Sequence, residues 1–307
     1  METPDKDEEE DEFSVLIQEY MEAVNSRNVE EQEAIMLKIF QHLGEERDEP
    51  SPWLQALAEA HICEAAFDWT GAEEAFKRAV EVSADQPALR SKALSHLSTF
   101  YDLIDLDVLS REAEQAANEV GRQSDVAMLH HSALMSDAKS HLKSKDLERA
   151  FLALTEASAG IEEGPMHDLP RARVLILRAE CHLAEGAFDK AEADLALVWN
   201  WLEPHSEAFF MAGWQSALAS YWATTARLRE QRGDLSGAVW AWREVVERRR
   251  IIAQCPQLEG PYKYNSLAIA LQRLAKSLRQ LEDDEATGVF EESSSIRRAI
   301  GLGTLKE

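Results

Sequence analysis

Cysteine, histidine and acidic side chains are the residues of this sequence whose types suit chemistry. His61 with Cys63, and Cys181 with His182, combine the side chains that commonly bind Zn²⁺. Adjacent residues and residues two apart point to different sides of a helix, so neither pair alone places two ligands on one ion. We expect these four side chains to pack in a helical core, and we predict no metal site.

Acidic clusters offer two further kinds of chemistry. Asp102, Asp105, Asp107 and Glu112 are spaced somewhat like calcium ligands, but the segment lacks the glycine that a calcium loop needs at its turn. The acidic run 283–285 could supply a general acid and base, yet no nucleophile or apolar pocket can be placed beside it. The sequence also lacks the usual phosphate-binding, zinc-protease and hydrolase motifs. We therefore predict that the chain is not an enzyme and needs no cofactor.

The charge of the chain restricts its partners. The 307 residues include 57 Asp and Glu against 32 Lys and Arg, which gives a formal net charge of −25. Such a chain repels nucleic-acid phosphates and anionic membrane surfaces, so we expect neither as a partner. Residues 1–50 hold 17 acidic and 4 basic side chains, whereas residues 221–300 hold 13 basic and 11 acidic ones. About half of the net charge therefore lies before residue 51, and the C-terminal part is close to neutral.

The sequence predicts a cytoplasmic protein. Residues 1–12 are acidic and lack the basic and apolar regions of a secretory signal. No apolar run of about eighteen residues, the length that spans a bilayer, occurs in the sequence. Cys63, Cys181 and Cys255 lie far apart and outside any C-x-x-C motif, which is typical of reduced thiols.

Helical periodicity dominates the rest of the sequence. We expect residues 1–12 to form a disordered acidic tail, residues 13–50 an N-terminal helical cap, residues 53–300 an array of helix pairs and residues 301–307 a C-terminal tail. Within the array a small residue is followed by a large one four positions later, and by a small or apolar one three further on. These offsets place all three on one helix face. The best copies are Ala72-Phe76-Ala79, Ala150-Leu154-Ala157, Ala191-Leu195-Val198 and Ala238-Trp242-Val245.

This pattern resembles the tetratricopeptide repeat (TPR), whose second helix carries Ala, a large residue and Ala. The resemblance covers about residues 53–300, in about six units, and implies an all-α, right-handed superhelix (an α-solenoid) of antiparallel helix pairs. The equivalent small positions are Ala72, Ser110, Ala150, Ala191, Ala238 and Ala286. They are separated by 38, 40, 41, 47 and 48 residues, whereas the standard unit has ~34. We therefore expect extended helices or linkers.

The resemblance also implies a site and a partner. In the family, defined first-helix positions line the concave groove, and the basic residues at matching positions here are Lys92, Lys139, Lys143, Arg173, Arg227, Lys276 and Arg279. A basic groove would attract an acidic or carboxylate-bearing segment of another protein or peptide. The alternative is that these cations neutralise glutamates on adjacent helices. The asparagines of the clamp that holds chaperone C-termini do not follow Lys139, so that particular partner is not expected.

Six of the eight tryptophans lie in the C-terminal half. Trp222 and Trp242 fall on core positions, whereas Trp201 and Trp240 fall off the core stripe and are candidate interface anchors. Burial within long, irregular repeats is the alternative for both. We interpret the nearby run 248–250, three arginines, as the basic end of a helix, where positive charge favours the helix dipole.

These observations favour a non-enzymatic adaptor or scaffold that holds a partner segment in the concave groove. Two alternatives remain open. The first is a self-associating structural component, in which the Trp-rich C-terminal half forms the interface of a homo-oligomer. The second is a regulatory TPR protein that senses a peptide or metabolite.

Overall fold

The computed structural model describes residues 51–123, 127–161, 164, 167–206, 212–255 and 261–302, together with Val15, Glu19, Ile35 and Lys38. Apart from those four residues, the predicted acidic tail and N-terminal cap lie outside the described part of the chain. Twelve α-helices make up most of the described ranges, in which no strand occurs, and this confirms the predicted all-α class. The helices are α3 (Pro52–Ala65), α4 (Trp69–Val82), α5 (Pro87–Leu103), α6 (Asp107–Arg122), α7 (Ala127–Lys143), α8 (Leu147–Ala159), α9 (Asp168–Glu185), α10 (Phe188–Leu202), α11 (Ala212–Gln231), α12 (Leu235–Gln254), α13 (Tyr262–Gln280) and α14 (Glu285–Ala299). None of these twelve is both long and apolar enough to cross a membrane.

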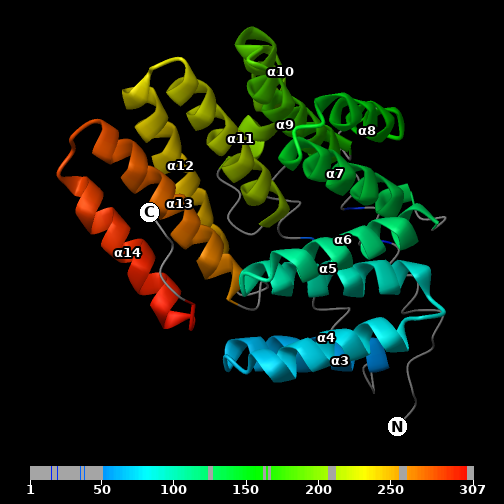
Figure 1. The fold of residues 1–307 in the computed structure, drawn as a ribbon. Coiled ribbons are helices and arrows are strands. Elements are labelled where there is room, and N and C mark those ends of the chain that lie inside the picture. The colour runs from blue at the N-terminus through cyan, green and yellow to red at the C-terminus, as the bar shows by residue number, and fades with distance from the viewer. Residues whose placement is uncertain are drawn as a thin grey trace.

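Consecutive helices form pairs, from α3 with α4 to α13 with α14, and each pair packs against the next. Figure 1 shows the pairs following one another around a curved array, from α3 and α4 at the bottom to α13 and α14 at the left. The first helices α7, α9 and α11 also contact one another in turn, so they lie side by side in one layer. The arrangement is an α-solenoid of helix pairs, as the sequence predicts.

The turn inside each pair repeats one backbone conformation. Each of these turns contains a residue in the left-handed region, with φ between 57° and 80°: Phe67, Asp105, Lys145, Gly186, Gly233 and Glu282. In the first five pairs this residue precedes the small residue of the second helix by five positions, so these units share one register despite their uneven spacing. The turn also begins the next helix: at Asp146 the backbone N–H donates to the His141 carbonyl at 2.9 Å, and the side chain accepts from the Arg149 N–H at 3.3 Å.

The repeated small and large residues form the core between the helices. All twelve residues of the four best copies are buried, and the four leading alanines have no exposed surface. The small side chains let neighbouring helices approach closely, and the large one fills the remaining space. Phe76, for example, is 1% exposed and lies 5.4 Å from Phe100, ring centroid to ring centroid. The predicted core positions are therefore confirmed.

Longer helices account for the wide spacing of the last units. The helices α11 and α12 have 20 residues each and α13 has 19, whereas α3 and α4 have 14 each. Aromatic side chains fill the extra contact area: Trp222 lies 5.3 Å from Trp199 and 4.8 Å from Tyr221, between ring centroids. Trp222 and Trp242 are 8% and 6% exposed, as their core positions predict.

The last unit of the array contacts the second unit, and Trp69 of the first unit packs against the same cluster. Leu103, at the end of α5, packs with Ile300 and Leu302, which follow α14, and all three are buried. The guanidinium of buried Arg297 on α14 lies 3.6 Å from the Asp105 carboxylate. The helix α13 also contacts α5, and Figure 1 shows it running toward that helix. The array therefore closes on itself, and Leu302, within the predicted tail 301–307, takes part in the closure.

Candidate functional site

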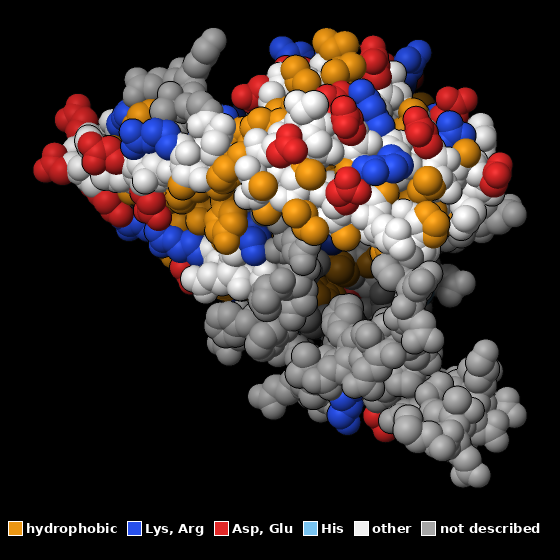
Figure 2. All heavy atoms as spheres, turned by 90° about the horizontal axis from the view of Figure 1, so that it is seen from below, with side chains coloured by type: hydrophobic (Ala, Val, Ile, Leu, Met, Phe, Trp, Pro, Cys, Tyr) orange, Lys and Arg blue, Asp and Glu red, His pale blue; other side chains and the backbone are white. Residues whose placement is uncertain are grey.

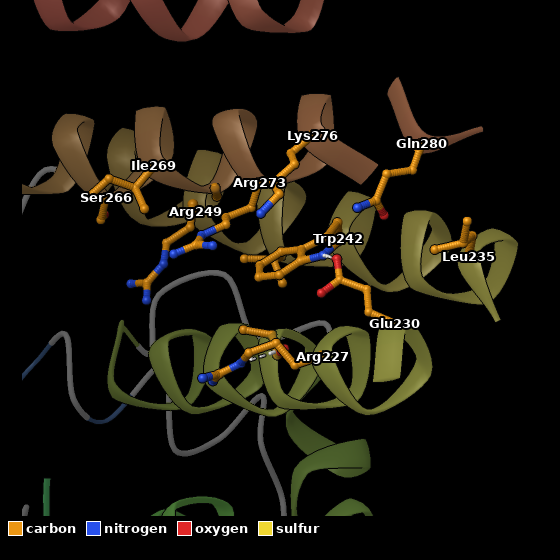
Figure 3. A pocket seen from close by; sticks show the side chains of 13 residues that line it. Arg227, Glu230, Leu235, Trp242, Arg249, Ser266, Ile269, Arg273, Lys276 and Gln280 are labelled. Atoms are coloured by element: carbon orange, nitrogen blue, oxygen red, sulfur yellow. Dashed lines mark hydrogen bonds between the residues drawn. The ribbon is translucent and has the colours of Figure 1, made fainter. Parts of the chain in front are cut away.

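A cavity of about 580 Å³ lies between α11, α12 and α13. Its charged lining residues are Arg227 and Glu230 on α11, Arg249 on α12, and Arg273 and Lys276 on α13. Figure 3 shows the side chains of Arg249, Arg273 and Lys276 directed into the same space, beside the ring of Trp242. We call this site, with its four cations and one carboxylate, the basic cavity.

Helical spacing brings these side chains together. Arg273 and Lys276 are three residues apart on α13 and therefore share a helix face. Arg249 follows Trp242 by seven residues on α12, so it lies above the buried ring on the same face. Trp242 packs in the core cluster with Leu271 and neighbouring leucines of α13. The cations thus stand on well-packed helices rather than on loops.

The acidic side chains near the basic cavity are already engaged. Glu180, from α9, accepts a hydrogen bond from the Arg227 guanidinium at 2.6 Å and forms an ion pair with it. The Oε1 atom of Glu230 accepts from the Trp242 indole at 2.9 Å and from the Ser277 hydroxyl at 2.7 Å. Arg227 is therefore neutralised, and Glu230 is held against α12 and α13.

The other three cations have no such partner. Within the part of the chain that the structure describes, no hydrogen bond or ion pair holds the side chain of Arg249, Arg273 or Lys276. Burial lowers the pKa of the Arg249 guanidinium, while nearby Tyr262 acts in the opposite direction. A cation that has lost part of its hydration without gaining an anion is unfavourable, so an incoming anion would be stabilised here.

The interpretation of the arginine run 248–250 as a basic helix end is wrong. The helix α12 continues to Gln254, and its last turn contains no basic residue. Arg248 instead pairs with Glu244 at 3.2 Å, and Arg250 pairs with Glu292 at 2.9 Å. The long helix directs the three side chains to different surroundings, and only the middle one enters the basic cavity.

A second, smaller cavity of about 220 Å³ lies between α7, α9 and α11. Lys139 and Arg173 line it together with Glu180, the partner of Arg227. The Arg173 guanidinium lies 3.5 Å from the Gly213 carbonyl oxygen, and the surrounding protein removes part of its hydration and lowers its pKa. Glu180 and Arg227 thus stand between the two cavities.

The remaining predicted groove residues lie outside both cavities. Lys92 lies over the Trp53 ring, with Nζ 5.6 Å from the centroid, and Arg279 stacks on Phe290 of α14 at 4.9 Å. Burial raises the pKa of the Asp102 carboxyl, and Lys143, at the end of α7, acts in the opposite direction. The structure therefore brings four of the seven predicted cations into two neighbouring cavities and leaves three elsewhere.

The two candidate interface tryptophans occupy different environments. Trp201 is half-buried against the core cluster of α9, α10 and α11, and Arg171 lies 5.9 Å from its ring centroid. Trp240 is 46% exposed, although its ring meets the edge of Trp222 at 4.8 Å and the Arg229 guanidinium at 5.3 Å. Trp240 is thus the more accessible of the two.

The cysteine and histidine side chains pack as the sequence predicts. Cys181 is fully buried, and burial raises the pKa of its thiol to about 11. His182 lies against Phe151, with 4.9 Å between ring centroids, and Cys63 packs against the core of the first two pairs. The imidazole of His61 lies 2.8 Å from the Glu64 carboxylate. Local packing and hydrogen bonding account for these groups.

Arg249 and Arg273 are the site residues that sequence analysis missed. Arg249 belongs to a second helix, and family geometry directs attention to first helices. Arg273 is absent from the family's groove positions, but its spacing of three from the predicted residue Lys276 is a signal that could have identified it. The position of Arg249 depends on the length of α12, which only the structure shows.

Comparisons with known proteins do not assign the chain to a family. No family model matches it, and no curated protein matches it. Among solved structures, it is similar to the crystal structure of BtubC (BKLC) from P. vanneervenii, with 14% sequence identity and a TM-score of 0.35. That match covers 100% of this chain and 96% of the other. The fold and the site described above therefore rest on the residues of this chain alone.

Proposed function

We propose that this chain is a non-enzymatic adaptor of long tetratricopeptide-type units, which binds an acidic segment of a partner protein along its first-helix surface. The shared turn, the small residues five positions after it and the paired helices support the family assignment. The basic cavity and the smaller cavity containing Lys139 and Arg173 support the acidic character of the segment. An extended acidic peptide could contact both cavities in succession.

The observation that carries the proposal is the set of unpaired cations in the basic cavity. In a chain with 57 acidic residues, nearby carboxylates are plentiful, and Figure 2 shows Lys and Arg intermixed with Asp and Glu over much of one outer face. Arg249, Arg273 and Lys276 nevertheless have no carboxylate partner among the described residues. The alternative is that the basic residues only neutralise glutamates on adjacent helices. It fits Arg227, which pairs with Glu180, but it does not fit these three cations.

Affinity capture from the lysate of the native host tests this proposal. The test variant reverses the charge of three cavity residues, Arg249→Glu, Arg273→Glu and Lys276→Glu. A matched control makes the same total change in charge at three exposed positions on the second helices α6, α8 and α10: Arg111→Glu, Arg149→Glu and Lys190→Glu. We expect the control and the wild type to retain the same partner and the cavity variant to lose it. Identical retention by all three would refute the proposed site.

Self-association is a second candidate function, which the exposure of Trp240 favours. An indole that is 46% exposed on a well-packed helix is a typical interface anchor. Sedimentation of the wild type and of Trp240→Ala across a range of concentrations tests it. A wild type that stays monomeric throughout would remove this candidate.

A further inference from the structure

The basic cavity has a charge pattern that suits a more specific ligand than a single carboxylate. Three unpaired cations from two helices line one space: Arg249, Arg273 and Lys276. A single carboxylate of a ligand would bring only one negative charge to these three positive charges. A phosphate monoester carries about −1.5 to −2 charges at neutral pH and has three strong acceptor oxygens. Two guanidinium groups and an ammonium can each donate to a different phosphate oxygen.

We propose that the basic cavity recognises a phosphate monoester, carried by a phosphorylated residue of the acidic partner segment. The inference rests on the proposed function and adds the chemical identity of the group that enters the cavity. A small phosphorylated molecule would present the same chemistry, and the experiment below separates the two sources. DNA and RNA also carry phosphates, but the net charge of −25 repels a polyanionic backbone.

The walls of the basic cavity fit a phosphate that is attached to a larger group. The volume of about 580 Å³ exceeds the 220 Å³ of the neighbouring cavity, and its lining includes Ala223, Val245 and Ala270. Ile269, at the edge, is 41% exposed. These apolar surfaces can pack against the carbon atoms that carry the phosphate and against an adjacent apolar side chain.

The engaged acidic residues explain why the cavity stays available to an anion. Glu230 is the only carboxylate among the described lining residues, and its Oε1 atom accepts two hydrogen bonds, from Trp242 and Ser277. To move toward Arg273 or Lys276, the Oε1 atom of Glu230 would have to leave the buried Trp242 indole without an acceptor. An external phosphate can bind the cations without that loss.

Retention of peptide pools on the immobilised full-length chain tests the proposal without knowledge of the partner. One pool has a fixed phosphoserine between randomised positions, and two matched pools have Ser or Glu at the fixed position. We expect the phosphoserine pool to be retained at least ~10-fold more strongly than the Glu pool, because its charge and number of acceptors match the three cations. This preference should weaken as salt is added.

Two neighbouring substitutions provide the matched comparison. Arg249→Gln removes a cation from the basic cavity, while Arg250→Gln makes the same chemical change at an exposed residue that pairs with Glu292. We expect Arg249→Gln and Arg273→Gln to abolish the phosphoserine preference and Arg250→Gln to preserve it. Far-UV circular dichroism checks that each variant is folded, and Arg249→Gln should fold normally because it removes an unpaired, partly desolvated charge.

Each outcome has a distinct meaning. Equal retention of the Glu and phosphoserine pools would overturn the phosphate assignment and leave the proposed binding of acidic segments standing. Loss of retention in Arg250→Gln as well as Arg249→Gln, or no retention of any pool, would also overturn it. If free O-phosphoserine competes as well as the phosphopeptide pool, the phosphate site is supported with a small molecule as its source. Much weaker competition supports the peptide.

Discussion

Glu230 joins three helices through one carboxylate oxygen, and its removal has a calculable cost. The oxygen accepts from Trp242 at 2.9 Å and from Ser277 at 2.7 Å, and these donors' residues are 6% and 1% exposed. A buried donor left without an acceptor costs about 1–3 kcal/mol. Ser277 can still donate to the Arg273 carbonyl at 3.2 Å, which offsets part of the loss. We therefore expect Glu230→Ala to lower the free energy of unfolding by about 2–4 kcal/mol.

Two further variants isolate the role of this oxygen. Glu230→Gln keeps an acceptor oxygen and should cost only about 1 kcal/mol, the difference between a charged and a neutral acceptor. Combining Glu230→Ala with Ser277→Ala should cost less than the sum of the single changes, with a coupling of about 1 kcal/mol. Urea unfolding followed by far-UV circular dichroism measures each value. Equal destabilisation by the Ala and Gln variants, or a loss below ~0.5 kcal/mol in Glu230→Ala, would refute the reasoning.

Three other predictions follow from the structure. Leu302→Asp should break the contact between the ends of the array, because it buries a charge against Leu103; small-angle scattering should show a larger radius of gyration, and an unchanged profile would contradict the closure. Burial of His96 lowers its pKa from 6.5 to about 4. Between these pH values the folded state therefore binds fewer protons than the unfolded state. Up to ~3 kcal/mol of the stability that is present above pH 6.5 is lost as the pH falls toward 4. His96→Phe should flatten this dependence in urea titrations between those pH values, and an unchanged slope would argue against it. The buried Cys181 thiol, whose pKa is raised to about 11, should react with a thiol reagent only when the protein unfolds. The half-buried Cys63 thiol should react sooner, and equal reaction rates of the two thiols would contradict this prediction.

The core of the array could be predicted from sequence because its cause is local. A small residue, a large one and another small one at offsets of four and three fix one helix face, whatever the length of the rest of the unit. Ala72, Phe76 and Ala79 are buried for this reason, and the same holds in the longer unit that contains Ala238. Helix length adds turns at the ends without changing this register.

The closure of the array and the membership of the basic cavity could not be predicted in the same way. Leu103 and Leu302 meet because small rotations between successive pairs accumulate around the array, and no single repeat encodes that sum. Arg249 enters the cavity because α12 extends beyond the standard helix. Lys143 and Arg279 show the converse error: they match family positions, but neither lines a cavity, and Arg279 stacks on Phe290 instead.

The unpaired cations bear on function because this chain has no shortage of acids. Arg248 and Arg250 have carboxylate partners, while Arg249 between them has none among the described residues. A glutamine in its place would avoid the cost of desolvating a charge. Arg273, which is exposed, adds a second unpaired cation to the same cavity. Stability of the free protein does not explain the unpaired Arg249, whereas the proposed binding of an external anion would, since the anion would offset the desolvation only in the complex.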